Sequence, residues 1–246
     1  MGRCIAVIPA RYASTRFPGK PLAPLLGRPM VAWVLDRARL IPGVDEVLVA
    51  TEDPRIATVV REAGGEAILT SATCPTGSDR VWEAVRGRPC DVVLNLQGDE
   101  PALDPFAVGD LVSLMRADPA LPMGTLAAPL DDSQAYADPN VVKVVLGDAG
   151  RCLYFSRSPI PFLRGLPLSG APVYRHVGVY AFRKEFLGQF TAWPQGPLEK
   201  AESLEQLRAL ERGVSIRAAV VSWAACAVDT PGDVARAEAA LRSIKR

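Results

Sequence analysis

The sequence predicts an α/β protein with a mostly parallel, doubly wound sheet and a mixed-sheet extension. In the first half of the 246-residue chain, short runs of Val, Ile and Leu alternate with segments that carry apolar residues at helical spacing. Such continuous apolar strands are typical of a parallel sheet that helices cover on both faces. The second half lacks this regular alternation, which favours mixed strand pairing there.

Four strands and three helices account for the first half. The strands are expected at 4–8, 46–50, 66–70 and 91–96, and the helices at 29–40, 54–63 and 77–86. In a sheet of this kind, ligands bind in the crevice at the carboxyl ends of the strands. The loops that follow these strands are therefore the first place to look for a site.

The second half contributes four further strands and two helices. The strands are expected at 123–129, 141–146, 175–182 and 215–221, and the helices at 198–211 and 231–241. Leu204, Leu207 and Leu210 fall on one side of the first helix, with Glu and Arg on the other. Thr230 is a plausible N-cap for the second helix, and Pro231 suits its first position.

Composition excludes several classes of protein. The net charge is +1, so bulk electrostatics do not favour nucleic acid or a membrane surface. No apolar run approaches the roughly 20 residues of a membrane span, and no signal peptide opens the chain, so we expect a cytoplasmic protein. The five cysteines are scattered and form no C-x-x-C pair, which argues against a zinc site and against a disulfide framework. Without repeats or long linkers, we expect one domain over 1–246.

The loop after the first strand is unusually basic. The stretch 8–30 contains Arg11, Arg16, Lys20 and Arg28 among prolines and glycines. At this edge of the sheet, Arg and Lys can hold phosphate oxygens, and Gly19 allows the backbone to approach closely. The stretch is neither a G-x-G-x-x-G nor a G-x-x-x-x-G-K-[ST] motif, which disfavours a dinucleotide site and a P-loop. Charge alone fits a solvated basic loop equally well.

Carboxylates follow two other predicted strands. Asp99 and Glu100 come after the strand 91–96, and Asp229 lies between the strand 215–221 and the C-terminal helix. One or two carboxylates beside phosphate oxygens are what Mg²⁺ prefers. The alternatives are a turn at Gly98–Asp99 and a helix-flanking carboxylate at Asp229.

Other polar residues are ambiguous when taken singly. Thr76 and Ser78 open a helix and fit an N-cap, a nucleoside contact, or both. His176 is the only histidine, and a lone histidine is more often structural than catalytic. A hydrolase triad is disfavoured because no G-x-S-x-G elbow is present. Arg157 and the acidic face with Glu202 also fit a solvated surface.

In combination and in this order, these motifs resemble one family, the 3-deoxy-manno-octulosonate (Kdo) cytidylyltransferases, or CMP-Kdo synthetases. The matching stretches are IPARYASTRFPGKPL (8–22), TGSDR (76–80), NLQGDEP (95–101), NVVKVV (140–145), LYFSRSPIPF (153–162), RHVGVYAF (175–182), PLEKAESLEQLRAL (197–210) and VDTPGDV (228–234). They span nearly the whole chain. The opening stretch distinguishes this family from the CMP-sialic acid synthetases.

The resemblance implies a fold like that of the nucleotide-diphospho-sugar transferases and a set of residue roles. The triphosphate of CTP would bind Arg11, Arg16 and Lys20, and the nucleoside would lie along Thr76, Gly77, Ser78 and Arg80. Mg²⁺ would bind Asp99 and Asp229, and the catalytic residues would be Lys20, Arg11 and Asp99. The sugar acid would contact Gln97, Arg157, His176, Tyr180, Glu202 and Gln206. Arg28 would belong to the solvated surface.

The resemblance also implies substrates and assembly. The chain would transfer the cytidylyl group of CTP to Kdo for lipopolysaccharide biosynthesis, as a homodimer that pairs through the second half. Residues 1–125 would bind nucleotide, 126–225 would bind sugar and dimerise, and 226–246 would carry the last metal ligand and a helix. The alternatives are transfer to a related acid such as 8-amino-Kdo, and non-catalytic binding of a sugar nucleotide. Two departures from the family pattern are a short stretch at 163–174 and Ala227 where glycine is frequent.

Overall fold

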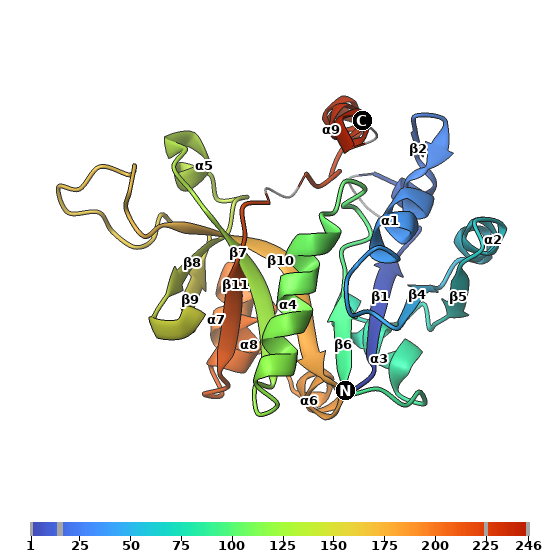
Figure 1. Cartoon of the computed structure of the whole chain (residues 1–246), viewed down its shortest axis with the longest axis horizontal. Coiled ribbons are helices and arrows are strands. Elements are labelled where there is room, and N and C mark those ends of the chain that lie inside the picture. Colours follow the sequence, from blue (N-terminus) through green and yellow to red (C-terminus); the bar gives the residue numbers. More distant parts are fainter. Residues whose placement is uncertain (1, 14–16, 224–225, 245–246) are drawn as a thin grey trace.

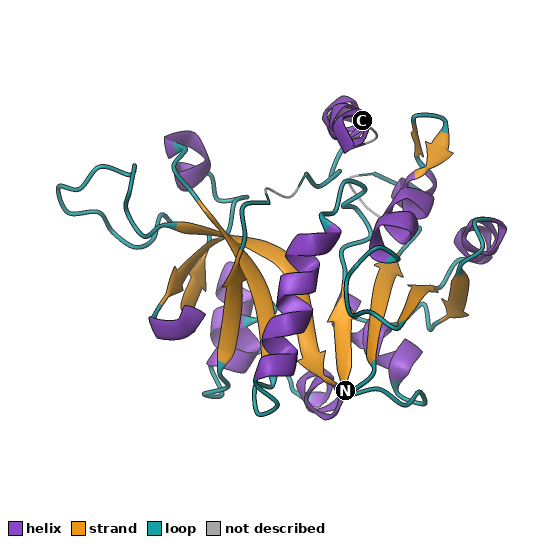
Figure 2. Ribbon diagram, in the orientation of Figure 1, coloured by secondary structure: helices purple, strands orange, loops and turns teal. Residues whose placement is uncertain are grey.

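A nine-stranded sheet forms the centre of the molecule (Figure 1, Figure 2). The computed structural model describes residues 2–13, 17–223 and 226–244. Seven strands follow the order β11-β7-β10-β6-β1-β4-β5, and β8 and β9 branch from β10. Among the described residues, no helix is long and apolar enough to cross a membrane.

The N-terminal half of the sheet is parallel. Its strands are β1 (Cys4–Ala10), β4 (Glu46–Thr51), β5 (Glu66–Leu69) and β6 (Val92–Asn95). β1 pairs in parallel with both β4 and β6, and β4 pairs in parallel with β5. The predicted doubly wound half is confirmed, and its carboxyl ends share one edge of the sheet.

The second half adds antiparallel pairing, which confirms the mixed extension. Its strands are β7 (Met123–Pro129), β8 (Lys143–Leu146), β9 (Cys152–Ser156), β10 (Tyr174–Arg183) and β11 (Ile216–Val220). β10 runs antiparallel to β6, β7 and β8, whereas β11 is parallel to β7. β10 therefore joins the two halves of the sheet.

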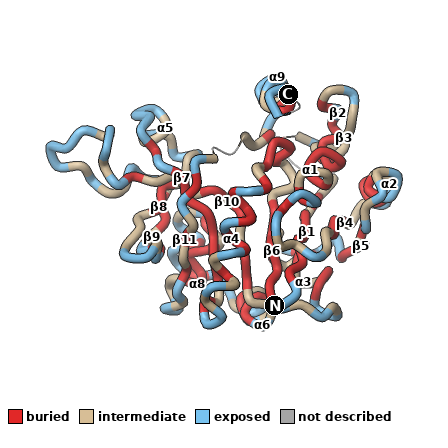
Figure 3. Tube along the Cα trace, viewed as in Figure 1, coloured by how far each residue is buried: buried red, intermediate tan, exposed pale blue. Residues whose placement is uncertain are grey.

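Helices cover both faces of the sheet and bury two apolar clusters (Figure 3). On one face lie α1 (Met30–Ala38), α2 (Pro54–Glu62) and α4 (Pro105–Ala117). On the other lie α3 (Gly77–Val85), α6 (Lys184–Ala192) and α8 (Leu207–Leu210), with α7 (Pro197–Glu202) beside α8. A short α5 (Ser133–Ala137) follows β7.

The predicted helix over 198–211 was wrong in its continuity. It is two short helices, α7 and α8, separated by residues 203–206, and the first helix ends at Ser203, whose φ of 52° is left-handed. The apolar side was predicted correctly, because Leu204 and Leu207 are both buried. The break follows from tertiary contacts: Glu202 bonds to β9, and Glu205 bonds to α3.

The C-terminal segment returns to the carboxyl edge of the parallel strands. A 3₁₀ turn (Pro231–Asp233) leads into α9 (Val234–Ile244), which places the predicted C-terminal helix slightly later. Val228 and Leu241 pack with α1 and with the hairpin of β2 (Pro24–Leu25) and β3 (Arg28–Pro29). This packing holds the segment that contains Asp229 beside the loops that follow β1 and β6.

Candidate active site

The basic loop is folded so that Lys20 faces the end of β6. Gly19 has a left-handed φ of 72°, and its N–H donates to the carbonyl of Tyr12 at 2.9 Å. This turn starts the 3₁₀ turn at Lys20–Leu22. The ammonium of Lys20 then lies 2.6 Å from Oδ2 of Asp99 and 3.7 Å from Oδ1 of Asp229. The structure thus brings together Lys20, predicted to bind the triphosphate, and the two carboxylates predicted to bind Mg²⁺.

Asp99 is placed by a glycine. A Cβ on Gly98 would lie 2.6 Å from the carbonyl oxygen of Pro9, so only glycine lets the loop after β6 pass the end of β1 this closely. The carbonyl of Asp99 accepts the N–H of Val228 at 2.9 Å. This backbone bond ties the loop after β6 to the segment that carries Asp229.

A buried carboxylate reinforces the same connection. Glu100 accepts the N–H of Cys226 at 2.8 Å and is only 5% exposed. Burial, with the neighbouring Asp99 second, raises the pKa of Glu100 to about 8. Asp233 accepts the N–H groups of Asp229 and Thr230 at 3.1 and 2.9 Å. Glu100 was noted in the sequence only as a carboxylate beside Asp99 and received no role, and Asp233 was not considered, although both lie inside the matching stretches.

The other basic residues of the loop differ in what they contact. Arg11 donates to the carbonyl of Cys74 at 3.0 Å and lines a cavity with Lys20 and Asp99. Arg16 lies outside the described residues. Arg28 pairs with Asp36 at 2.7 Å and lies over the ring of Trp33, away from Asp99.

The start of α3 carries the residues expected to contact the nucleoside. Thr76 and Asp79 form a capping box, and Gly77 lines two of the cavities. Ser78 donates to Glu205 at 2.8 Å. Arg80 is 1% exposed and pairs with Glu52 at 2.9 Å, so in this structure its guanidinium supports the loops beneath the cavity.

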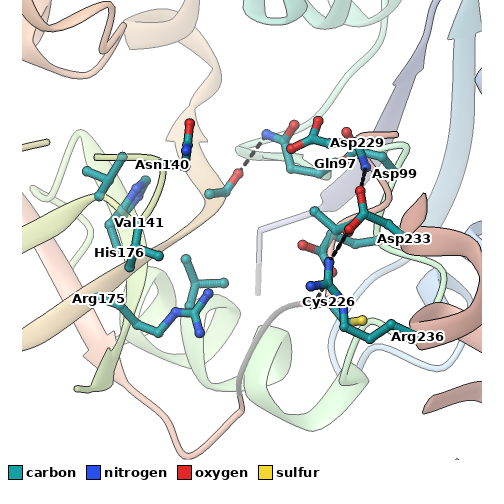
Figure 4. A pocket seen from close by; sticks show the side chains of 15 residues that line it. Gln97, Asp99, Asn140, Val141, Arg175, His176, Cys226, Asp229, Asp233 and Arg236 are labelled. Atoms are coloured by element: carbon teal, nitrogen blue, oxygen red, sulfur yellow. Dashed lines mark hydrogen bonds and ion pairs between the residues drawn. The ribbon is translucent and has the colours of Figure 1, made fainter. Parts of the chain in front are cut away.

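Two adjoining cavities lie between β6 and β10, and Gln97, His176 and Gly178 line both. The larger, of about 680 Å³, has Arg175 and Asn140 on one side and Asp99 and Asp229 on the other (Figure 4). The smaller, of about 360 Å³, adds Tyr180, Glu205 and Gln206. Arg175 and Asn140 received no role from the sequence, although both stand in matching stretches.

The sugar-side residues are linked through short hydrogen bonds. Gln97 donates from Nε2 to the carbonyl of Gly178 at 2.7 Å. The Tyr180 hydroxyl donates to Oε1 of Gln206 at 3.0 Å, and burial raises the pKa of Tyr180 well above its usual value. His176 contacts Thr125 through Nε2 at 2.9 Å. Four predicted residues therefore gather at these cavities.

Arg157 and Glu202 are engaged with each other instead. The guanidinium of Arg157 donates to the carbonyls of Glu202 at 2.7 Å, Pro139 at 2.9 Å and Ser203 at 3.4 Å. Glu202 accepts from the Ser156 hydroxyl at 2.6 Å and from the Arg157 N–H at 2.9 Å. These contacts brace the turn between α7 and α8, and neither residue lines the two cavities.

The ionisation of His176 gives a first testable prediction. Burial lowers its pKa from 6.5 to about 3, whereas an unfolded chain takes up this proton near pH 6.5. The neutral ring therefore contributes stability above pH 6.5, and this contribution is lost as the pH falls from 6.5 towards 3. We expect His176→Gln to remove up to about 1.4 kcal/mol per pH unit of acid destabilisation in that window.

The measurement is the free energy of unfolding by urea at several values between pH 4.5 and 7.5. Wild type and His176→Gln share all other titrating groups, so the difference between their two slopes isolates the histidine. Parallel pH dependences for the two proteins would show that His176 titrates normally in the folded state.

Comparison with known proteins places the chain in a family. The sequence model described as "Cytidylyltransferase" matches residues 5–216. The chain belongs to the cytidylyltransferase family. It is 48% identical over 246 residues to a 3-deoxy-manno-octulosonate cytidylyltransferase of Syntrophotalea carbinolica, covering 97% of this chain and 98% of that protein. The corresponding protein of Myxococcus xanthus is 50% identical over 244 residues, covering 98% and 97%.

Solved structures agree with the fold. A CMP:2-keto-3-deoxy-manno-octonic acid synthetase complexed with CTP superposes with a TM-score of 0.93 at 42% identity, covering 99% of this chain and all of that one. A cytidylyltransferase from Leptospira borgpetersenii has a TM-score of 0.64 at 16% identity, covering 99% and 94%, and supports the fold alone.

Proposed function

We propose that the chain transfers the cytidylyl group of CTP to the anomeric hydroxyl of Kdo, giving CMP-Kdo and pyrophosphate. The observation that carries this proposal is the ion-paired group of Lys20, Asp99 and Asp229 at the mouth of the cavities lined by Gln97 and His176. A cation and two carboxylates there suit a triphosphate with its metal, and the polar cavities suit a polyhydroxy acid. The similarity to named Kdo cytidylyltransferases over nearly the full length supports the same substrates.

The chemistry is a single displacement. The anomeric hydroxyl attacks the α-phosphorus of CTP, the bond to the β-phosphate oxygen breaks, and pyrophosphate leaves. The main obstacle is charge, because an anionic sugar must approach a triphosphate. Lys20 and Arg11 offset this repulsion and stabilise the charge that develops on the leaving group. No covalent enzyme nucleophile is needed.

The donor set fits Mg²⁺. Asp99 and Asp229 both lie within 4 Å of one cationic atom, Nζ of Lys20, so these two carboxylates already flank a single positive charge. Mg²⁺ is commonly held by one or two carboxylates with phosphate oxygens and waters. When bound, the ion would neutralise phosphate charge and lower the pKa of a coordinated hydroxyl.

The remaining features of the proposal rest on the family resemblance. They are a role in lipopolysaccharide biosynthesis, a cytoplasmic location, a homodimer formed through the second half, and the division of the chain near 125 and 226. The contacts expected for Arg16, Ser78, Arg80, Arg157 and Glu202 also stay predictions. The stretch 157–173 projects from the end of β9 and exposes Phe162 and Leu166, which suits a contact with a second copy.

A coupled assay of pyrophosphate release tests the proposed function directly. Purified protein with CTP, Mg²⁺ and Kdo is expected to release pyrophosphate, and omission of any one of the three is expected to abolish release. Competition between Kdo and 8-amino-Kdo separates the two sugar acids. Calorimetric binding of CTP without turnover on any 3-deoxy-ulosonate would instead favour a non-catalytic binding protein.

A further inference from the structure

Strand β10 is interrupted where it borders the cavities. Its register against β7 runs from Val177 opposite Leu126 directly to Tyr180 opposite Thr125, so Gly178 and Val179 form a bulge. β10 pairs with β6 only from Tyr180 onward. The bulge therefore marks the point at which β10 separates from β6 and the two cavities open.

A buried hydroxyl fills this irregularity from the opposite strand. Thr125 is fully buried, and its Oγ1 lies 2.8 Å from the carbonyl oxygen of Val179 and 3.4 Å from that of Val177. The same oxygen lies 2.9 Å from Nε2 of His176. Bulges leave ladder groups unpaired, and a buried carbonyl without a donor destabilises the fold. Thr125 supplies that donor.

These distances favour one tautomer of the histidine ring. A threonine hydroxyl has one proton, and a carbonyl can only accept, so the 2.8 Å contact uses that proton for Val179. The oxygen is then an acceptor for His176, and Nε2 must carry the ring proton. Phe155 and Tyr180 pack against the ring with centroids at 5.0 and 5.4 Å and hold its orientation.

The other ring nitrogen is left for a ligand. Nδ1 of His176 has no hydrogen-bond partner among the described residues, and the ring lines both cavities. A neutral ring with its proton on Nε2 presents a lone pair on Nδ1. Such an atom accepts from a hydroxyl and repels a carboxylate oxygen. The same bulge also aims the carbonyl of Gly178 at the Gln97 amide, at 2.7 Å.

We propose that Thr125 is a positioning residue that fixes His176 as the Nε2-protonated tautomer, so that Nδ1 accepts a hydrogen bond from a hydroxyl of the sugar acid. His176 then selects a polyol and takes no part in proton transfer. This inference rests on the proposed function for the identity of its ligand, whereas the tautomer is a property of the ligand-free protein.

The single histidine makes the tautomer directly measurable. Protein labelled with ¹⁵N-histidine and carrying no histidine tag gives ring signals from His176 alone. Two-bond proton–nitrogen couplings are expected to show a proton on Nε2 and none on Nδ1, and Kdo is expected to shift the Nδ1 resonance. A proton on Nδ1 in the free protein, or an Nδ1 resonance that saturating Kdo leaves in place, would overturn the proposal.

Matched variants test Thr125 itself. Thr125→Val keeps the shape and removes the hydroxyl, and it is expected to raise KM for Kdo about ten-fold while KM for CTP stays near wild type. The Nε2 proton of Thr125→Val should exchange with water faster. Thr125→Ser restores the hydroxyl and is expected to return both readouts to wild-type values. A folded Thr125→Val with wild-type KM for Kdo would contradict the inference.

The outcomes separate this inference from the proposed function. Failure to release pyrophosphate with CTP and Kdo counts against the function, whereas an active enzyme with its ring proton on Nδ1 counts against the role of Thr125 alone. If Thr125→Val does not fold, the wild-type spectrum still decides, because the position of the ring proton is measured on the native protein.

Discussion

Replacement of Lys20 by Met is expected to lower kcat for pyrophosphate release by about 10²–10³, the usual cost of removing one well-placed group that stabilises charge. The physical reason is that the ammonium lies at the junction of both carboxylates and beside the cavity that Arg11 lines. The effect should fall mainly on kcat, because charge on the departing pyrophosphate develops in the transition state. The assay is initial rate at saturating CTP, Mg²⁺ and Kdo.

Arg28 provides a matched control from the same basic stretch. Its guanidinium pairs with Asp36 on an exposed surface and stacks on Trp33, and it does not approach Asp99. Arg28→Met should leave kcat within about two-fold of wild type, since exposed ion pairs contribute little. Equal losses in the two variants would mean that net charge of the loop matters and that the placement of Lys20 does not.

A second readout for Lys20 needs no turnover. In the ligand-free protein its ammonium offsets the charge of Asp99 at 2.6 Å. Lys20→Met leaves both carboxylates without that cation, so Mg²⁺ alone should raise the melting temperature of the variant more than that of wild type. A smaller Mg²⁺ effect in the variant would show that Lys20 and the ion do not share this site.

The sequence was sufficient to locate this charge cluster. Strands that end at the same edge bring their following loops together, so the position of Lys20, Asp99 and Asp229 after three strand ends predicted their meeting. Gly19 and Gly98 were visible as glycines, but only the structure shows that Gly98 is required by the carbonyl of Pro9. The sequence pattern thus predicted that these side chains meet. Which residues the surrounding backbone permits, such as glycine at position 98, became visible only in the packed structure.

Other features could not be predicted, because distant contacts decide them. No Gly or Pro marks Ser203, yet the helix breaks there because Glu202 and Glu205 bond to different elements. The resemblance placed Arg157 among the sugar contacts, but its guanidinium donates to carbonyls of three residues from two other segments. Thr125 carries no functional signal in sequence, since it is a single threonine within an otherwise apolar strand.

The two carboxylates should behave as one unit. Asp99→Asn keeps the shape of the side chain and removes its charge, and we expect kcat to fall by about 10³ with a higher Mg²⁺ requirement. Asp229→Asn should have a similar effect, because the two carboxylates lie on adjoining backbone. The N–H of Val228 donates to the carbonyl of Asp99 at 2.9 Å. The double variant should be scarcely worse than either single one, as is usual for groups that act together.

Asp104→Asn is the control for carboxylate loss. Asp104 caps α4 through the N–H of Phe106 at 2.9 Å, and asparagine is an equally good N-cap, so this variant should retain wild-type activity and Mg²⁺ dependence. The informative measurement is kcat as a function of Mg²⁺ for all four variants. If the losses from Asp99→Asn and Asp229→Asn multiplied in the double variant, the two residues would act independently. Normal Mg²⁺ dependence in Asp229→Asn would leave Asp99 as the one metal carboxylate of the pair, with Asp229 serving to balance Lys20.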